Sequence, residues 1–420
     1  MTPSIDQTNG ISRLPSPIRV EVPGETLEDV VAAFHLARAE VASLFAAIGL
    51  DPSKTRETAR ALGINRGLAW RISRMVRESD PAAAASDVPG TASMARLFNA
   101  CRERGVSESA LAATAAAFTR FESALSACTG DRKTLAMLMA NLSTAHDRSE
   151  TEKARRTLFE GACGVWGVQA QTRFVTVFLY PSASDPTMLD AGHVTGYVGF
   201  RRLSSKPWPL SYEAVHKSTG EAERFVKEPL DPVGFTEGQL QLIKAFCSPT
   251  TPDIEVVTSN EYKRFELAAG PVGNQGLTTC VFGTRLRSIY PRYSDTPNTA
   301  GFMVILTTPT ERVLFDFFVH RDLGNAPVRT HLLDRLSHLY GNIESEFERQ
   351  SLPLAEQARQ LPRGAAGTMC HYIPWYTKLI EFVTERIGHD VNEFTGSRFE
   401  MNYPPISTTL SRRIDLHPQP

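Results

Sequence analysis

The spacing of apolar residues changes near residue 170, and this change most constrains the fold. Before it, apolar residues recur at intervals of three and four, as in Val30, Phe34, Ala37 and Val41, which indicates amphipathic helices. After it, short apolar runs such as 174–179 are typical of strands. The strands come in runs instead of alternating with helices, which favours a mixed or antiparallel sheet over a doubly wound one. The sequence therefore predicts an α+β protein: an all-helical N-terminal region, then a mixed or antiparallel sheet domain with C-terminal helices.

Breaks in these patterns divide the chain into regions. A chain of 420 residues is too long for one ordinary core. Its first residues are polar and interrupted by proline, and a capping box at Thr26 predicts where order begins. The predicted regions are a disordered leader, 1–25; a small helical domain, 26–80; a helical connector, 91–167; and an α+β effector or assembly domain, 168–420.

Three elements of the last region are predicted individually. Two apolar runs, 301–308 and 312–320, are separated by a turn with Pro309 in its second position, which predicts a β-hairpin. Residues 329–349 have helical spacing, and a last helix fits 375–387, with Gly388 placed to end it.

Charge and composition exclude several classes of protein. The net charge is −1, from 45 basic and 46 acidic residues, which excludes a polycation and an acidic tail. The longest apolar runs are shorter than the ~18 residues of a membrane span, and residues 1–25 lack the basic segment of a signal peptide. The six cysteines are scattered without a C-x-x-C pair, as expected for buried thiols in a reducing compartment. We therefore expect a cytoplasmic protein without membrane contact.

One segment, 55–72, carries a functional motif. Ala59 is small where a second helix would cross closely, and Gly63 stands where the chain would turn with positive φ. Leu62, Ile64 and Ile72 supply apolar contacts that could hold two helices at a steep angle. With these residues the segment resembles the helix-turn-helix of bacterial transcriptional regulators. The resemblance implies that 26–80 is a DNA-binding domain and that a recognition helix begins at Asn65 or Arg66 and runs to about Arg77.

Positive charge is concentrated on this motif. Residues 51–77 contain seven basic and two acidic side chains, a net charge of +5, whereas the rest of the chain sums to −6. Such a concentration is typical of a phosphate-binding surface.

The resemblance assigns roles to individual side chains. In the docking that is usual for the family, the first turns of the second helix face base edges, which implies base contacts by Asn65, Arg66, Trp70 and Arg71. It implies phosphate contacts by Lys54, Arg56, Arg74 and Arg77. Trp70 has a second interpretation, packing back onto the helices, which we favour.

Other local patterns do not predict chemistry. The segment 320–323, His-Arg-Asp-Leu, imitates the catalytic loop of protein kinases but lacks its asparagine, so it is interpreted as a charged exit from the predicted hairpin. The glycines of 270–276 lack the spacing of a nucleotide-binding loop. His331, Asp334 and His338 are interpreted as a solvated helix edge. We therefore predict no catalytic residue, no metal ligand and no cofactor.

The sequence favours a sequence-specific transcriptional regulator. Its partners would be double-stranded DNA, a second copy of the chain in a homodimer, and a small molecule or protein as effector of the C-terminal domain. Two alternatives stay open. The first is an enzyme of unknown reaction in the α+β domain, and the second is an interaction module whose N-terminal helices pack internally. Pairing of Arg66, Arg71 and Arg74 with acids would favour the interaction module.

Overall fold

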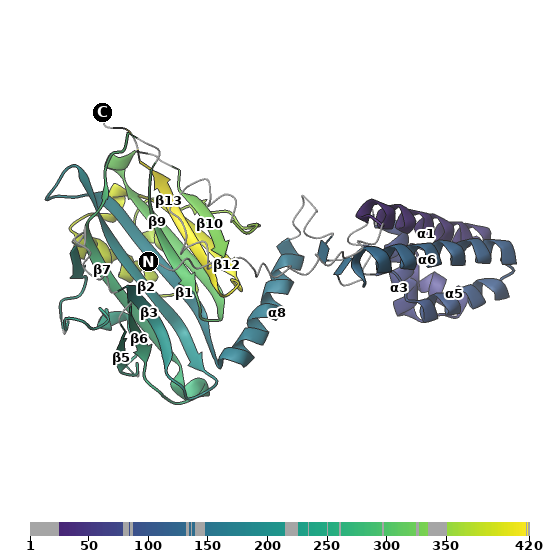
Figure 1. Cartoon of the computed structure of the whole chain (residues 1–420), viewed down its shortest axis with the longest axis horizontal. Coiled ribbons are helices and arrows are strands. Elements are labelled where there is room, and N and C mark those ends of the chain that lie inside the picture. The colour runs from purple at the N-terminus through teal and green to yellow at the C-terminus, as the bar shows by residue number, and fades with distance from the viewer. Residues whose placement is uncertain are drawn as a thin grey trace, which may run out of the picture. The chain divides into compact units, whose positions relative to one another are not determined.

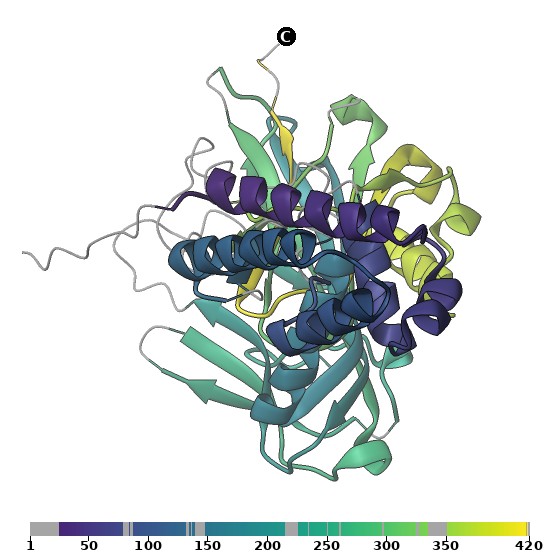
Figure 2. The same ribbon diagram turned by 90° about the vertical axis from the view of Figure 1, so that its right-hand side faces the viewer.

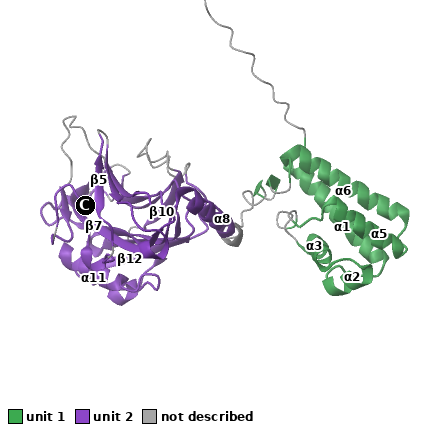
Figure 3. Cartoon of the chain, turned by 90° about the horizontal axis from the view of Figure 1, so that it is seen from below, with its two compact units in different colours: residues 1–146 green, residues 147–420 purple. Residues whose placement is uncertain are grey.

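A computed structural model of the chain divides it into two compact units, 1–146 and 147–420 (Figure 3). The structure describes residues 25–78, 84, 87–131, 134–135, 137–138, 148–214, 226–233, 235–249, 251–259, 262–295, 298–324, 327–334, 351–416 and 418. The predicted leader, except for Glu25, lies outside these residues. Unit 1 is helical and unit 2 is a mixed sheet domain with a late helix, so the predicted α+β class is confirmed.

Unit 1 is built on one core shared by its helices. These are α1 (Leu27–Ala47), α2 (Thr55–Leu62), α3 (Arg66–Arg77), α5 (Thr91–Glu103) and α6 (Glu108–Thr129). The capping box predicted at Thr26 is present, since its side chain and that of Asp29 bond each other's backbone N–H groups. α1 and α6 lie along one another, with the Phe34 and Phe121 rings 6.0 Å apart (Figures 1 and 2).

Helix α1 also has the length and apolar composition of a membrane span, the one such helix among the described residues. Core helices of folded domains share these properties, and seven α1 residues are buried in the core of unit 1. α5 and α6, predicted as part of a connector over 91–167, contribute to this same core. The next long helix, α8 (Arg148–Trp166), belongs to unit 2.

Unit 2 is built around a seven-stranded sheet in the order β11-β12-β9-β1-β2-β7-β4. Its strands are β1 (Val168–Pro181), β2 (Met188–Arg202), β4 (Val226–Pro229), β7 (Thr278–Pro291), β9 (Thr310–His320), β11 (Arg359–Gln360) and β12 (Phe394–Asn402). β1 and β9 run parallel and all other neighbours are antiparallel, so the sheet is mixed.

Further elements cover this sheet. On one face lies a three-stranded sheet of β10 (Arg329–Asp334), β13 (Thr408–Asp415) and β8 (Thr299–Leu306). On the other face packs α11 (Tyr376–Ile387). A third sheet consists of β3 (Trp208–Ala214), β6 (Tyr262–Leu267) and β5 (Ile254–Thr258). Alternate residues of β1 and β9 point into the two cores: Val175 and Phe315 toward β8 and β13, Phe174 and Leu314 toward α11.

The predicted hairpin of 301–308 and 312–320 is wrong. β8 pairs with β13, whereas β9 pairs with β1 and β12, so the connection at Pro309 passes from one sheet to the other. The two strands face each other across the core, with the Phe302 and Phe317 rings 6.3 Å apart. An alternating apolar pattern is compatible with strands that pack face to face as well as with strands that pair in one sheet. The turn sequence is also compatible with both arrangements.

The helix predicted over 329–349 is also wrong at its start. Arg329–Asp334 forms β10, paired with β13, because Leu332 and Leu333 are buried in the sheet structure. Residues 335–349 lie outside the described residues. The last predicted helix is confirmed as α11, and Gly388 ends it in the left-handed conformation, with φ 80°.

Candidate functional site

The helical corner of the predicted motif is formed by α2 and α3. Gly63 caps α2 in the left-handed conformation, with φ 64°, and its N–H donates to the carbonyl of Ala59. The N–H of Ile64 donates to the same carbonyl over 3.1 Å. The next residue, Asn65, is the N-cap of α3. The chain therefore ends one helix and begins another within three residues, at the positions that the sequence predicted.

Apolar contacts fix the corner to the rest of unit 1. The buried side of α3 includes Leu68, Ile72 and Met75, which lie in the same core as Leu62 of α2 and the buried residues of α1. Ala69 is wholly buried, which explains why a small residue stands there. Because one side of α3 is held in this core, its other side faces away from it.

The outward side of α3 is basic and includes an exposed tryptophan. With 3.6 residues per turn, Arg66, Trp70, Arg71, Arg74 and Arg77 fall within an arc of about 140°. Arg66 and Arg77 are exposed, and Arg71 and Arg74 are partly buried. Trp70 is 48% exposed, so our preference for its packing back onto the helices is wrong.

Acids hold one of these arginines. Arg74 Nε lies 3.1 Å from Asp87 Oδ2, its guanidinium lies 3.9 Å from Glu78 Oε2, and it also lies over the Trp70 ring. In the parts of the chain that the structure describes, no ion pair joins Arg66 or Arg71 to an acid. Pairing of these arginines with acids would favour the interaction module, and among the described residues only Arg74 of the three meets that criterion.

The remaining predicted contact residues surround this surface. Asn65 Oδ1 accepts a 2.7 Å hydrogen bond from the N–H of Leu68, so part of its side chain caps α3. Lys54 Nζ lies 3.5 Å from Glu57 Oε2, and both side chains are more than half exposed, so solvent screens this pair. Arg56 is exposed at the start of α2.

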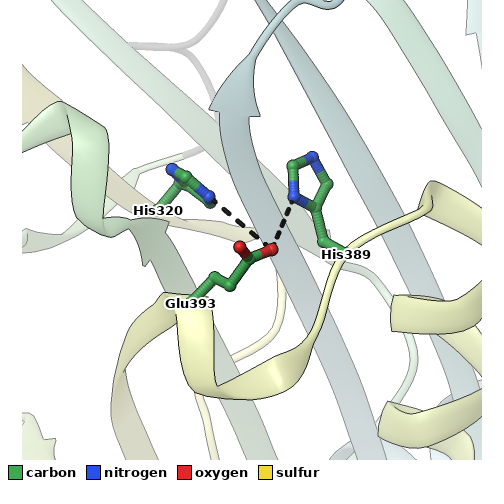
Figure 4. Close-up of side chains that lie close together, drawn as sticks. All are labelled: His320, His389 and Glu393. Carbon is green, nitrogen blue, oxygen red and sulfur yellow. Dashed lines mark hydrogen bonds and ion pairs between the residues drawn. The ribbon is translucent and has the colours of Figure 1, made fainter.

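A second cluster, in unit 2, was missed by the sequence analysis. His320, His389 and Glu393 converge in Figure 4, and one ligand atom from each lies within 4.8 Å of the others. His389 Nδ1 is 3.0 Å and His320 Nε2 is 3.9 Å from Glu393 Oε2. From the sequence alone, His320 is interpreted only as part of a charged exit from the predicted hairpin.

The sheet topology brings this cluster together. His320 is the last residue of β9, and it pairs with Phe394 at the start of β12. His389 follows the glycine that ends α11, and Glu393 closes the short turn Val391–Glu393 that precedes β12. The only local signal was the four-residue spacing of His389 and Glu393. The contact with His320 depends on strand pairing, which the sequence did not predict.

Burial and hydrogen bonds set the protonation of this cluster. Burial lowers the pKa of His320 below its usual value, although Asp322 and Glu393 act in the opposite direction. The hydrogen bond with His389 lowers the pKa of Glu393. At neutral pH, therefore, His320 is uncharged and Glu393 is a carboxylate.

Comparison with known proteins identifies no family. No protein-family description and no curated protein matches the chain. One solved structure from Parabacteroides distasonis, described as a "putative protease", aligns at 8% identity with a TM-score of 0.26, over 60% of this chain and 41% of that one. The chain thus spans less than half of that protein's length, and so low a TM-score does not show a shared fold.

Proposed function

We propose that unit 1 binds double-stranded DNA and that α3 is the recognition helix of a transcriptional regulator. The observation that carries the proposal is the outward arc of α3, which combines Arg66, Arg71 and Arg77 with an exposed Trp70. A helix that is held by its apolar side and presents arginines on the other has the arrangement needed to enter a major groove. The net charge of +5 over 51–77 adds attraction to phosphates.

The exposure and ion pairs of the side chains support the following roles within this proposal. Arg66 and Arg71 read base edges, since arginine can donate two hydrogen bonds to guanine. Trp70 lies against a sugar or a thymine methyl group. Arg77, Lys54 and Arg56 bind phosphates. Arg74 contributes less to phosphate binding, because its guanidinium is already paired with Asp87.

Asn65 combines two roles. Its carbonyl oxygen caps α3, which leaves the amide NH₂ to donate to a base. A bidentate contact with adenine would also need the carbonyl oxygen and would compete with the cap.

Assembly as a dimer and the role of unit 2 belong to the same proposed function. A cytoplasmic regulator of this kind acts as a homodimer, because two recognition helices one DNA turn apart match a two-fold operator. Unit 2 then serves in sensing an effector or in oligomerisation. Analytical ultracentrifugation with and without an operator fragment tests the dimer, and a monomer under both conditions would contradict it.

Fluorescence anisotropy on mixed-sequence duplex DNA, at about 50 mM and 200 mM salt, tests DNA binding. We expect salt-sensitive binding that weakens at least about tenfold in Arg66→Ala/Arg71→Ala, since two cationic contacts are lost. The matched control is Arg96→Ala/Arg102→Ala, which removes the same charge from exposed side chains of α5. It should weaken binding less than about threefold.

Circular dichroism must show the same helix content in all three proteins. No binding at low salt would contradict the proposed function. Equal losses in the two double variants would remove the assignment of α3 as the recognition helix.

A further inference from the structure

We propose that His320, His389 and Glu393 bind a divalent transition metal ion, zinc in the first place. The ion would join the end of β9 to the connection between α11 and β12. This site lies in unit 2, so it is independent of the DNA-binding proposal.

The separations of the three side chains suit a metal ion. Zinc lies 2.0–2.2 Å from histidine nitrogens and carboxylate oxygens, so neighbouring ligand atoms of a tetrahedral site are about 3.3 Å apart. In the structure, Glu393 Oε2 lies 3.0 Å from His389 Nδ1 and 3.9 Å from His320 Nε2. All three ligand atoms lie within 4.8 Å of one another, so side-chain shifts of up to about 1.5 Å reach ligand geometry. The 3.9 Å separation is too long for a hydrogen bond, whereas an ion between the two groups would contact both.

The donor types favour zinc over the common alkaline-earth ions. Two imidazole nitrogens and one carboxylate oxygen are donors that zinc accepts, whereas magnesium and calcium prefer oxygen ligands throughout. Arg321 Nη2 donates to Glu393 Oε1 over 3.2 Å, so Oε2 is the oxygen directed at the histidines. Three protein ligands leave the fourth position of a tetrahedral ion for water or another small ligand.

Neighbouring residues can orient His320 for this role. Its Nδ1 accepts a 3.2 Å hydrogen bond from the N–H of Asp322, which leaves the ring proton on Nε2. Binding through Nε2 requires that proton on Nδ1, which breaks the hydrogen bond from Asp322 N–H; Asp322 Oδ2, 3.7 Å from Nδ1, accepts the proton after a shift of less than about 1 Å. A carboxylate that accepts from the second nitrogen of a metal-binding histidine is a common arrangement in zinc sites.

Aromatic rings pack against both histidines. The Tyr180 ring lies 4.7 Å from the His389 ring, and the Phe394 ring lies 5.3 Å from the His320 ring. Tyr180 is on β1, whose parallel pairing with β9 brings its end next to the end of β9. These rings limit the orientations of both imidazoles, so little side-chain freedom remains to be lost on binding.

The test uses the full chain without a histidine tag, stripped of metal with a chelator and then titrated with zinc against a chromophoric competitor. Because the six cysteines could bind zinc, cobalt(II) is the second probe, and it should give visible d–d bands without the near-ultraviolet thiolate charge-transfer band. We expect about one equivalent of tightly bound metal and a rise of about 5 °C or more in the melting temperature of unit 2.

The variants compare ligands with matched residues. His389→Ala and His320→Ala should weaken metal binding at least about 100-fold, and Asp322→Asn about 10- to 100-fold. His371→Ala removes an exposed histidine outside the cluster and should bind like the original chain. If an alanine variant does not fold, Glu393→Gln keeps the side-chain shape and should still weaken binding more than about tenfold.

Absence of tight binding in the original chain would overturn the proposal. So would equal binding by the original chain, His389→Ala and Glu393→Gln, or a cobalt spectrum with a thiolate band. Because DNA binding is proposed for unit 1 and metal binding for unit 2, failure of one proposal does not imply failure of the other.

Discussion

At the scale of single residues, unit 2 contains a buried ion pair whose charged groups are fully hydrogen-bonded. Asp316 and Arg398 face each other across β9 and β12, with hydrogen bonds of 2.7 and 2.8 Å, and both are almost wholly buried. The Tyr376 hydroxyl of α11 donates to the same carboxylate over 2.8 Å. Burial alone would lower the pKa of Arg398, but the hydrogen bonds and charge of Asp316 raise it above its usual value.

Arg398→Met should lower the free energy of unfolding of unit 2 by about 3–5 kcal/mol, because it leaves the buried Asp316 carboxylate without its partner. The control is Arg329→Met, which breaks the more exposed pair with Asp415 and should cost less than about 1 kcal/mol. Urea unfolding followed by tryptophan fluorescence measures both. Similar losses in the two variants would contradict the importance of the buried pair.

The pH dependence of stability should show the titration of His193. Burial, together with the nearby Arg173 guanidinium, lowers its pKa to about 4 from the usual 6.5. The folded state therefore binds this proton less readily than the unfolded state. Its contribution is complete above about pH 6.5, and about 3 kcal/mol is lost as the pH falls toward 4.

His193→Gln removes this titration, so the difference in unfolding free energy between the original chain and the variant should shrink as the pH falls from 7 to 4. Urea unfolding at several pH values measures it, and the difference cancels other titrating groups. A difference that stays constant over this range would show that His193 has an ordinary pKa.

At the scale of elements, the N-cap of α3 links stability to the proposed interface. Asn65→Ala should lower the free energy of unfolding of unit 1 by about 1 kcal/mol, since the N–H of Leu68 loses its acceptor. Asn65→Ser keeps a capping oxygen and should stay within about 0.5 kcal/mol of the original. Thermal unfolding followed by circular dichroism at 222 nm separates them. Equal destabilisation by serine and alanine would show that the hydrogen bond is not what stabilises the cap.

Elements were predictable where the local sequence contains the whole signal. The capping box at Thr26, the turn at Gly63 and the end of α11 at Gly388 are local, and all three are present. β12 and β13 were not predicted at all. β8 and β9 were recognised as strands, but their partners were wrong, because pairing depends on which segments meet across the core and not on the turn between them.

At the scale of the whole molecule, each unit has its own hydrophobic core. Calorimetry of the full chain should therefore show two transitions. If both proposals hold, duplex DNA should raise only the transition of unit 1 and zinc only that of unit 2, since a ligand stabilises the part that binds it. Two variants assign the transitions: Arg66→Ala/Arg71→Ala should lose the shift caused by DNA, and His389→Ala should lose the shift caused by zinc. A single transition shifted by either ligand would show that the units unfold together.

The sequence by itself determined the α+β class and the helical corner at 55–77, because helical periodicity, caps and a turn glycine act over a few residues. It also located the cluster of basic side chains on that corner. Only the tertiary structure decided that Trp70 is exposed, that Arg74 is held by Asp87, and that 91–129 shares the core of α1. It alone brought His320 to His389 and Glu393, because that contact requires β9 and β12 to pair across a long intervening stretch of chain. Burial and strand pairing are properties of the folded chain, and one-dimensional spacing does not contain them.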